Sequence, residues 1–467
     1  MSQRNLAWLL AVPALVIAAG VLMSFTAPPA ERDYKTVRNL VDVVSEVDRS
    51  FYRQLSEKDK KKFVEDMING GLRGLDDYSE YYNEEQYKHF QADNKGNYGG
   101  IGAFLGLDPA TGTLSIASTM PESPAMEAGL QPNDLILMID GKSTEGFNVD
   151  GARELVMGEV GKEVALTIRR AGTKDDFDVK LKRMEIQNHP VKGIRRNADD
   201  PKKWDFVFEA DGIAYIRLIA FTETAGDELV AALKEADAAG AKGLILDLRD
   251  NPGGLLKLAE SISDLFLSEG FIVHTRDRNN TGRDVKAKKD NSVWEVAAKR
   301  PMAVLINGGN GGSASAAEIV AAALQDNKRA VIVGERSYGK GCVQRSIVSQ
   351  DEKTALKLTT EIWLTPNERH IHRGKGAKES DDWGVKPDAG FEVKPTTEQM
   401  LQFYLHRREI EMNRKTPPPE PKPGKGPPPV KLDPNYKDPV LEKAREHLKG
   451  QIAEIGLAPN RGGPKPG

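Results

Sequence analysis

The sequence predicts an α/β protein with a small, mostly β domain inserted ahead of its main domain and a helical segment before both. The main domain is predicted from residues 205–400, where apolar strand-like runs such as Gly243–Leu248 and Met302–Ile306 alternate with helix-like runs such as Ala225–Ala239. This alternation is typical of parallel βαβ units. Residues 96–184 differ, because they are punctuated by glycine and contain only short strand-like runs.

The first 30 residues predict a membrane segment. Leu6 to Phe25 carries no charge and follows Arg4, and twenty helical residues span roughly 30 Å, the thickness of a bilayer core. A cleaved signal peptide and a retained signal anchor both fit this pattern. The stretch Ser24–Pro29 has no Ala-x-Ala cleavage site and contains prolines, which favours the anchor. With Arg4 kept inside, the remaining residues face outside the cytosol.

Residues 31–95 predict helices. Val37, Leu40 and Val41 recur at three- and four-residue spacing, as expected for an amphipathic helix, and a second helical stretch runs from about Glu57 to Leu75.

The main domain is expected to span residues 185–400. Residues 401–432 are rich in proline, which predicts a stiff extended linker. Residues 433–467 predict a short charged helix, about Pro439–Ile455, and a tail.

Charge and cysteine content exclude two classes of protein. A net charge of −3 argues against a nucleic-acid partner, which would favour a strongly basic face. The single cysteine, Cys342, excludes an intrachain disulfide.

The most informative segment for chemistry runs from Asn307 to Gln344. A glycine- and serine-rich run follows an apolar strand and ends at Ser315, where an alanine-rich helix begins. A serine at such a turn lies beside free backbone N–H groups and the positive end of the helix dipole, which can hold an oxyanion. The helix is about 18 Å long, and the returning strand covers about 20 Å. Lys340 can therefore reach the Ser315 hydroxyl.

A serine and a lysine can together perform acyl transfer. A lysine acts as general base when burial keeps its amine neutral, and Ser–Lys pairs substitute for Ser–His pairs. Gln344 follows four residues after Lys340 and could orient its amine. A second glycine cluster, Arg249–Gly254, also follows a predicted strand, at the edge of the sheet where α/β proteins bind ligands. The amides of Ala316 and of Gly253 or Gly254 would form the oxyanion hole.

Three motifs together closely resemble those of the C-terminal processing peptidases, also called tail-specific proteases. They are Asp247–Gly254, Gly312–Ile319 and Gly339–Gln344. The resemblance implies a crotonase/ClpP-like ββα catalytic core in residues 185–400, with Ser315 as nucleophile, Lys340 as general base and Gln344 as third residue. It also implies a serine endopeptidase of the bacterial cell envelope, anchored in the inner membrane with its catalytic domain on the periplasmic side. The stretch Glu368–Trp383 departs from the family pattern as an insertion.

Residues 96–184 resemble a PDZ domain. Gly99-Gly100-Ile101-Gly102 matches its carboxylate-binding loop, in which successive backbone N–H groups bind a chain terminus. A peptide would add as a strand beside Ile101–Leu105 and pack an apolar terminal side chain near Leu155. The expected partners are therefore proteins or peptides with apolar C-termini, and the sequence leaves open whether an adaptor protein takes part.

Plainer interpretations stand beside these. Ser315 taken alone would be a helix cap, and Gly334–Lys340 is an incomplete phosphate loop, since residue 341 is not Ser or Thr. His370 and His372 have no evident third ligand, so we expect a solvated loop and no metal site. The Ser–Lys mechanism needs no metal or organic cofactor. Glu318 and Asp326 are expected to hold local structure.

Two other functions remain open at this point. A non-catalytic PDZ scaffold of the envelope would bind C-termini without cutting them. A crotonase-like acyl-CoA enzyme would leave the PDZ domain and the anchor without a purpose.

Overall fold

The computed structural model describes residues 31–108, 111–120, 123–147, 149–170, 175–187, 189–200, 202–288, 300–309, 311–412 and 432–456. The chain divides into two compact units, Met1–Tyr81 and Tyr82–Gly467. The predicted membrane segment at Leu6–Phe25 and the prolines of the predicted linker lie outside the described residues. Within the described parts of the chain, no helix is both long and apolar enough to cross a membrane.

The first unit contains the two predicted helices. Its helices are α2 (Glu31–Ser50) and α3 (Glu57–Arg73), and the short strand β1 (Glu80–Tyr82) spans the boundary between the units. A capping box starts α3, because the Ser56 hydroxyl accepts from the Asp59 amide at 3.2 Å while the Asp59 carboxylate accepts from the Ser56 amide at 3.2 Å. The apolar stripe of α2 is largely exposed, with Val37, Leu40 and Val41 each more than half accessible.

The inserted domain is an antiparallel sheet with two short helices. The sheet has the order β3-β4-β5-β7-β8, so β3 lies at its edge, and α6 packs beside β3. Its core is formed by apolar residues of both helices and the strands, such as Ile101, Ala125 and Leu166. The elements of this part are α4 (Glu84–Lys95), β2 (Asn97–Gly100), β3 (Ala103–Leu107), β4 (Leu114–Thr119), α5 (Pro124–Glu127), β5 (Leu135–Ile139), β6 (Lys142–Ser143), α6 (Val149–Val156), β7 (Glu163–Arg169), β8 (Asp176–Lys182) and β9 (Met184–Gln187).

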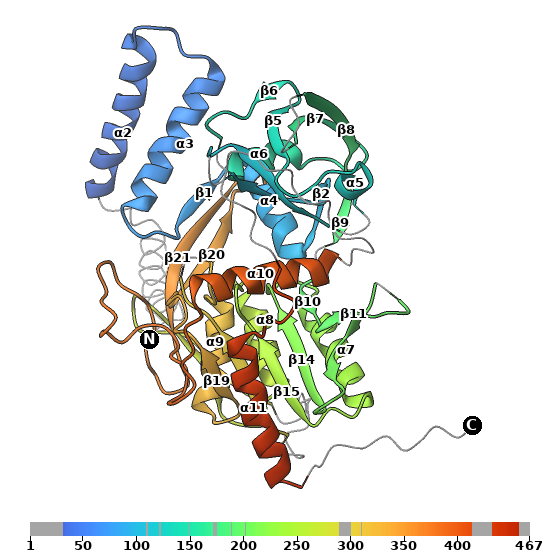
Figure 1. Cartoon of the computed structure of the whole chain (residues 1–467). Coiled ribbons are helices and arrows are strands. Elements are labelled where there is room, and N and C mark those ends of the chain that lie inside the picture. The colour runs from blue at the N-terminus through green and yellow to red at the C-terminus, as the bar shows by residue number, and fades with distance from the viewer. Residues whose placement is uncertain are drawn as a thin grey trace, which may run out of the picture. The chain divides into compact units, whose positions relative to one another are not determined.

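A parallel sheet with the order β14-β15-β18-β19 organises the main domain, and β10 and β13 add to β14 in the antiparallel sense (Figure 1). Helices α7, α8 and α9 connect or follow its strands, so the α/β class is confirmed. The elements are β10 (Val191–Lys192), β11 (Arg195–Arg196), β12 (Trp204–Asp205), β13 (Val207–Phe208), β14 (Ile213–Leu218), α7 (Ala225–Ala238), β15 (Gly243–Asp247), α8 (Leu256–Asp264), β18 (Met302–Ile306), α9 (Ala316–Asp326) and β19 (Val331–Gly334).

The strands of this sheet are buried on both faces, which explains their continuous apolar runs. Leu244, Leu246 and Val304 point into a core shared with α7, α8 and α9. The alternate side chains, such as Ile245 and Leu305, point to the other face. That face is covered by α11 (Pro439–Glu454), which lies along it in Figure 1. The predicted C-terminal helix is thus part of the core.

A second sheet, which the sequence did not predict, takes strands from before and after the turn that carries Ser315. Its strands are β16 (Phe271–Asp277), β17 (Asp284–Lys286), β20 (Cys342–Val348) and β21 (Ala355–Leu364), and they pair in the antiparallel sense. Because β20 begins two residues after Lys340, this sheet fixes the segment that carries the lysine. Trp363 on β21 adds a bond from its indole N–H to the Lys340 carbonyl at 2.9 Å.

The predicted start of the linker at residue 401 is wrong. Residues 401–412 belong to α10 (Thr397–Met412). The prolines begin only at Pro417, and the apolar residues of α10 do not form a stripe on one face, so the periodicity gave no helical signal.

We predict that α11 contributes substantially to stability. Leu448 is fully buried against the sheet, so Leu448→Ala should lower the free energy of unfolding by about 2–5 kcal/mol, measured by urea denaturation. Leu432→Ala makes the same change at an exposed side chain and should cost less than about 0.5 kcal/mol. Equal effects of the two substitutions would contradict the structural role of α11.

Candidate active site

The parallel sheet brings the three predicted motifs to one edge. Asp247 is paired in register with Leu305, and Ile306 with Gly334, so β15, β18 and β19 end side by side. The segments that follow these strands carry Gly253 and Gly254, Ser315, and Lys340, respectively. The predicted convergence of three strand ends is therefore present in the structure.

Ser315 lies at a strained strand-to-helix turn. It precedes the first residue of α9 and has φ 54° and ψ −114°, a conformation that residues other than glycine rarely adopt. A sharp turn of this kind between a strand and a helix projects a serine hydroxyl out of the backbone, as nucleophilic serines require. Strain of this size persists only where the surroundings impose it.

Glu318 provides the main restraint on this turn. Its side chain is fully buried in the first turn of α9. One carboxylate oxygen, Oε2, accepts the amide of Ser315 at 2.8 Å and the amide of Lys340 at 2.8 Å. The other, Oε1, accepts the Ser337 hydroxyl at 2.5 Å and the Gly339 amide at 2.6 Å.

These bonds place the serine and the lysine next to each other. Because one oxygen atom bonds both amides, the Ser315 and Lys340 backbones lie within about twice a hydrogen-bond length. Both residues are half-buried. A further bond from the Tyr338 amide to the Ser313 carbonyl, at 2.9 Å, joins the same two segments.

The glycine loop packs directly against the serine. A Cβ atom added to Gly253 would lie 2.8 Å from the Ser315 Cβ and 2.9 Å from the Ala316 nitrogen, so only glycine fits there. The Ala314 amide bonds the Asn251 carbonyl at 2.9 Å, which ties the loop to the serine turn.

Among the predicted oxyanion donors, Ala316 and Gly253 have different surroundings. The Ala316 amide opens α9 and has no acceptor within the helix. The Gly253 amide donates to the Asn251 side-chain oxygen at 2.8 Å. Gly254 has φ 145° and approaches the Phe221 carbonyl so closely that a side chain is excluded. The loop therefore needs its two glycines for steric reasons, and its role as an oxyanion hole stays a prediction.

Gln344 has partners of its own. Its side-chain amide donates to the Cys342 sulfur at 3.2 Å and to the Thr359 hydroxyl at 3.1 Å. Its orienting effect on Lys340 remains a prediction.

The stretch Glu368–Trp383 touches the lysine segment, which the sequence did not indicate. The Gly341 amide donates to His372 Nδ1 at 3.3 Å, and the Arg373 amide donates to the Gly339 carbonyl at 2.8 Å. These contacts hold the glycines on both sides of Lys340.

Glu318 is the residue whose importance the sequence analysis missed. We expect it from the sequence to hold local structure, which it does, but it also joins the first turn of α9 to the segment 337–340. Its position three residues after Ser315, at the N-terminus of a helix, was the available signal, since an acidic side chain there bonds the capping backbone.

The expected peptide-binding loop of the inserted domain is rigidly held. Gly102 has φ 69°, and a Cβ there would lie 2.2 Å from Ser123 Cβ. Ser123 donates its hydroxyl to the Gly102 carbonyl at 3.1 Å. Ile101 is buried in the domain core, while Leu155 on α6 is half-buried beside it. Gly100 ends β2, which pairs with β9. The four predicted residues thus border the start of the edge strand β3.

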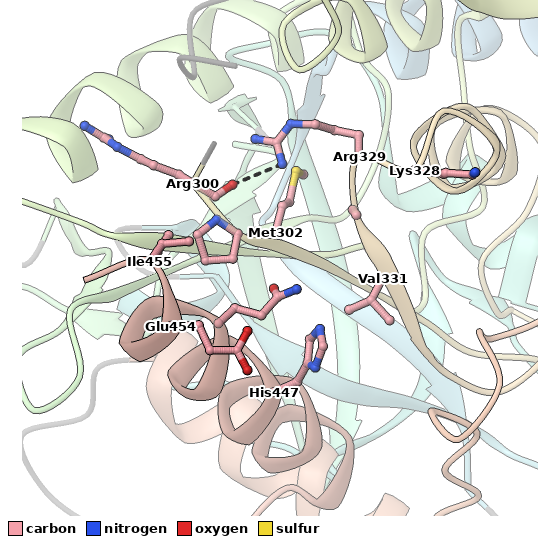
Figure 2. A pocket seen from close by; sticks show the side chains of 11 residues that line it. Arg300, Met302, Lys328, Arg329, Val331, His447, Glu454 and Ile455 are labelled. Atoms are coloured by element: carbon pink, nitrogen blue, oxygen red, sulfur yellow. Dashed lines mark hydrogen bonds between the residues drawn. The ribbon is translucent and has the colours of Figure 1, made fainter. Parts of the chain in front are cut away.

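A separate cavity of 360 Å³ lies at the opposite edge of the parallel sheet, where β18 and β19 begin. Figure 2 shows Arg329 in it, bonded to the Arg300 carbonyl, with His447 of α11 nearby. It is remote from the strand ends that carry Ser315 and Lys340. The described residues hold no cluster of three or more His, Cys, Asp or Glu suited to a metal ion.

The chain is similar in sequence to known peptidases and PDZ domains. Residues 212–390 match the model of peptidase family S41, and residues 115–170 match that of a PDZ domain. The chain is 37% identical over 348 residues to the carboxy-terminal-processing protease of Bartonella bacilliformis, across 74% of each chain. It is 37% identical over 332 residues to the carboxy-terminal processing protease CtpA of Bacillus subtilis, across 71% of this chain and 65% of that one. The solved photosystem II D1 C-terminal processing protease aligns with 75% of this chain and 86% of its own, at 24% identity and a TM-score of 0.44.

The buried carboxylate predicts a pH-dependent stability. Burial raises the pKa of Glu318, although its hydrogen bonds oppose the shift. A raised pKa means that the folded state holds the proton more tightly, so this group stabilises most below the ordinary carboxyl pKa and loses that contribution as the pH rises through its folded pKa. The wild type should therefore lose stability relative to Glu318→Gln as the pH rises above the ordinary carboxyl pKa of about 4.5, measured by urea denaturation.

Glu446→Gln makes the same chemical change at an exposed site of α11 and serves as the control. If the free energy of unfolding of the wild type, relative to that of Glu318→Gln, stays constant or increases as the pH rises, the raised pKa is contradicted.

Proposed function

Because this chain belongs to peptidase family S41, we propose that it is a serine endopeptidase that uses a Ser315–Lys340 pair and acts near the C-termini of proteins. Its membership confirms the resemblance inferred from the three sequence motifs. The observation that best supports the pair is the shared bonding of both backbones to one carboxylate oxygen of Glu318.

The proposed reaction passes through an acyl-enzyme. The Ser315 hydroxyl oxygen forms a bond to the scissile carbonyl carbon while its proton moves to the Lys340 amine. Amides near Ala316 and the glycine loop stabilise the resulting oxyanion. When the carbon–nitrogen bond breaks, Lys340 returns the proton to the leaving amine. Water then repeats the sequence and releases the acid and the free serine.

Substrate selection is proposed to use the PDZ domain. An extended peptide would add to the edge strand β3, with its terminal carboxylate at the loop Gly100–Gly102 and its last apolar side chain near Leu155. Proteins with apolar C-termini are the substrates that this arrangement fits. Both curated relatives described above carry carboxy-terminal processing in their names.

The cell envelope is the proposed location. The uncharged segment Leu6–Phe25 behind Arg4 would anchor the chain in the inner membrane, with the peptidase domain on the periplasmic side.

The proposed pair predicts the loss of cleavage in two variants. Ser315→Ala and Lys340→Ala should each lower kcat by about 10⁴-fold or more, since either change removes a reacting group. Cleavage of fluorescein-labelled, reduced and alkylated casein provides the assay, with product termini identified by mass spectrometry. Lys328→Ala, at an exposed lysine of the same domain, should retain full activity. Either variant cleaving at the wild-type rate would refute the pair, and an inactive wild type would favour the scaffold hypothesis.

The PDZ proposal predicts dependence on a free carboxylate. In the Ser315→Ala background, a fluorescent peptide ending in two leucines should bind about tenfold more tightly than its C-terminally amidated form, because the loop amides bind the terminus. Leu155→Glu should abolish this preference, as followed by fluorescence polarisation. Phe177→Glu, on β8 at the opposite edge of the sheet, should leave it intact. Equal affinity for the two peptides would exclude terminus recognition.

A further inference from the structure

The C-terminal segment makes a series of contacts before α11 begins. The Asp433 amide donates to the Gln402 side chain at 2.9 Å, and the Asp433 carbonyl lies 2.8 Å from His406 Nε2. The Tyr436 ring stacks on His406, with 5.1 Å between ring centroids. Residues 432–438 are thus held on α10, which fixes the point where α11 starts.

Asp438 at that point has two sets of partners. Its Oδ1 accepts the amides of Val440 and Leu441, at 3.0 and 3.3 Å, and so caps α11. On the other side it faces Arg249, whose Nη1 lies 3.1 Å from Oδ1 and whose Nη2 lies 2.7 Å from Oδ2. The Asp438 side chain is 10% exposed and that of Arg249 5%, so this bidentate pair is largely shielded from water.

Arg249 is held from three directions. Besides Asp438, its guanidinium bonds Asp247, with Nη2 2.6 Å from Oδ2, and stands over the Phe403 ring of α10 at 4.3 Å. Burial by itself would raise the pKa of Asp247, but Arg249 and Arg217 bring it down to about 2. Asp247 and Arg249 are therefore both charged at neutral pH, and the Asp438 carboxylate lies against a guanidinium that is held in place.

Arg249 begins the loop that supports the serine. The next residue, Asp250, has φ 56° and accepts the Tyr404 hydroxyl of α10 at 3.0 Å. The loop then reaches Gly253, which packs against Ser315. The C-terminal elements and the nucleophile therefore contact opposite ends of the same six-residue loop.

We propose that Asp438 is a positioning residue of the active site, which fixes the glycine loop beside Ser315 through its bidentate bond to Arg249. The inference rests on the proposed peptidase function. A loop with two glycines at positive φ has many conformations available when unrestrained. Catalysis of acyl transfer needs its amides within a fraction of an ångström of their working positions, and a displacement of about 1 Å can cost about a hundredfold in rate. The bidentate bond between Asp438 and Arg249 supplies that restraint.

Asp438→Asn is the sharpest test in the full-length chain. Asparagine has the same size and remains a good helix cap, but it removes the charge and one of the two oxygens that face Arg249. We expect kcat on labelled casein to fall about tenfold to a hundredfold, with KM changed less than about twofold, because the transition state and not the substrate is affected.

Asp211→Asn provides the matched control. Asp211 bonds the same helix, through Arg445 at 2.7 Å and Lys449 at 3.2 Å, but it precedes β14, at the edge of the sheet away from Ser315. It should lower the Tm about as much as Asp438→Asn does, yet leave kcat unchanged. Tyr404→Phe gives an independent arm, since it removes the bond to Asp250 without touching α11, and should lower kcat about fivefold.

The kcat values of the three variants either support or overturn the positioning role of Asp438. A selective fall of kcat in Asp438→Asn and Tyr404→Phe supports the proposal. Wild-type kcat in Asp438→Asn, or an equal fall in Asp211→Asn, overturns it and leaves α11 as a purely stabilising element. An inactive wild type would instead count against the proposed function, which keeps the two failures distinct.

Discussion

The geometry of the active site depends on a buried carboxylate that accepts four hydrogen bonds. Removing the charged Glu318 side chain from water is costly, and the hydrogen bonds to both of its oxygens offset part of that cost. Three of those donors are backbone N–H groups, so the carboxylate fixes main chain rather than side chains. It joins the first turn of α9 to the segment 337–340. The serine and the lysine are adjacent because their backbones share this partner.

The same carboxylate helps to maintain the strained conformation of Ser315. A non-glycine residue at φ 54° costs of order 1–3 kcal/mol, and the bond from its amide to Glu318 is available in that conformation. The packing of α9 adds rigidity, because its alanines are fully buried and let the helix lie close to the sheet. A helix that cannot shift keeps Glu318, and with it the turn, in place. The conformation of Ser315 therefore depends on the packing of α9 in the core.

The sequence predicted the elements that depend on local patterns. Strands such as Met302–Ile306 and the helix after Ser315 follow from apolar runs and alanine content, and the meeting of three motifs follows from parallel strand ends. The sequence did not predict the sheet that contains β16 and β21, because the burial of these strands is mixed. It did not predict α10, because the apolar residues of that helix do not form a stripe on one face. It also carried no sign of contacts between distant residues. The bond between Arg249 and Asp438 joins residues 189 positions apart, a distance over which a single sequence carries no signal.

The position of α11 connects stability to chemistry. Without it, the sheet face bearing Ile245, Leu305 and Val333 would be open to water, so some element must cover that face. The covering helix necessarily runs along strands whose C-terminal ends form the active site. Its N-terminus lies beside Arg249, two residues after the end of β15, and the acidic cap Asp438 bonds both the helix and Arg249. Covering the sheet and positioning the glycine loop are thus both consequences of the docking of α11, even though Arg249 and Asp438 are 189 positions apart in the sequence.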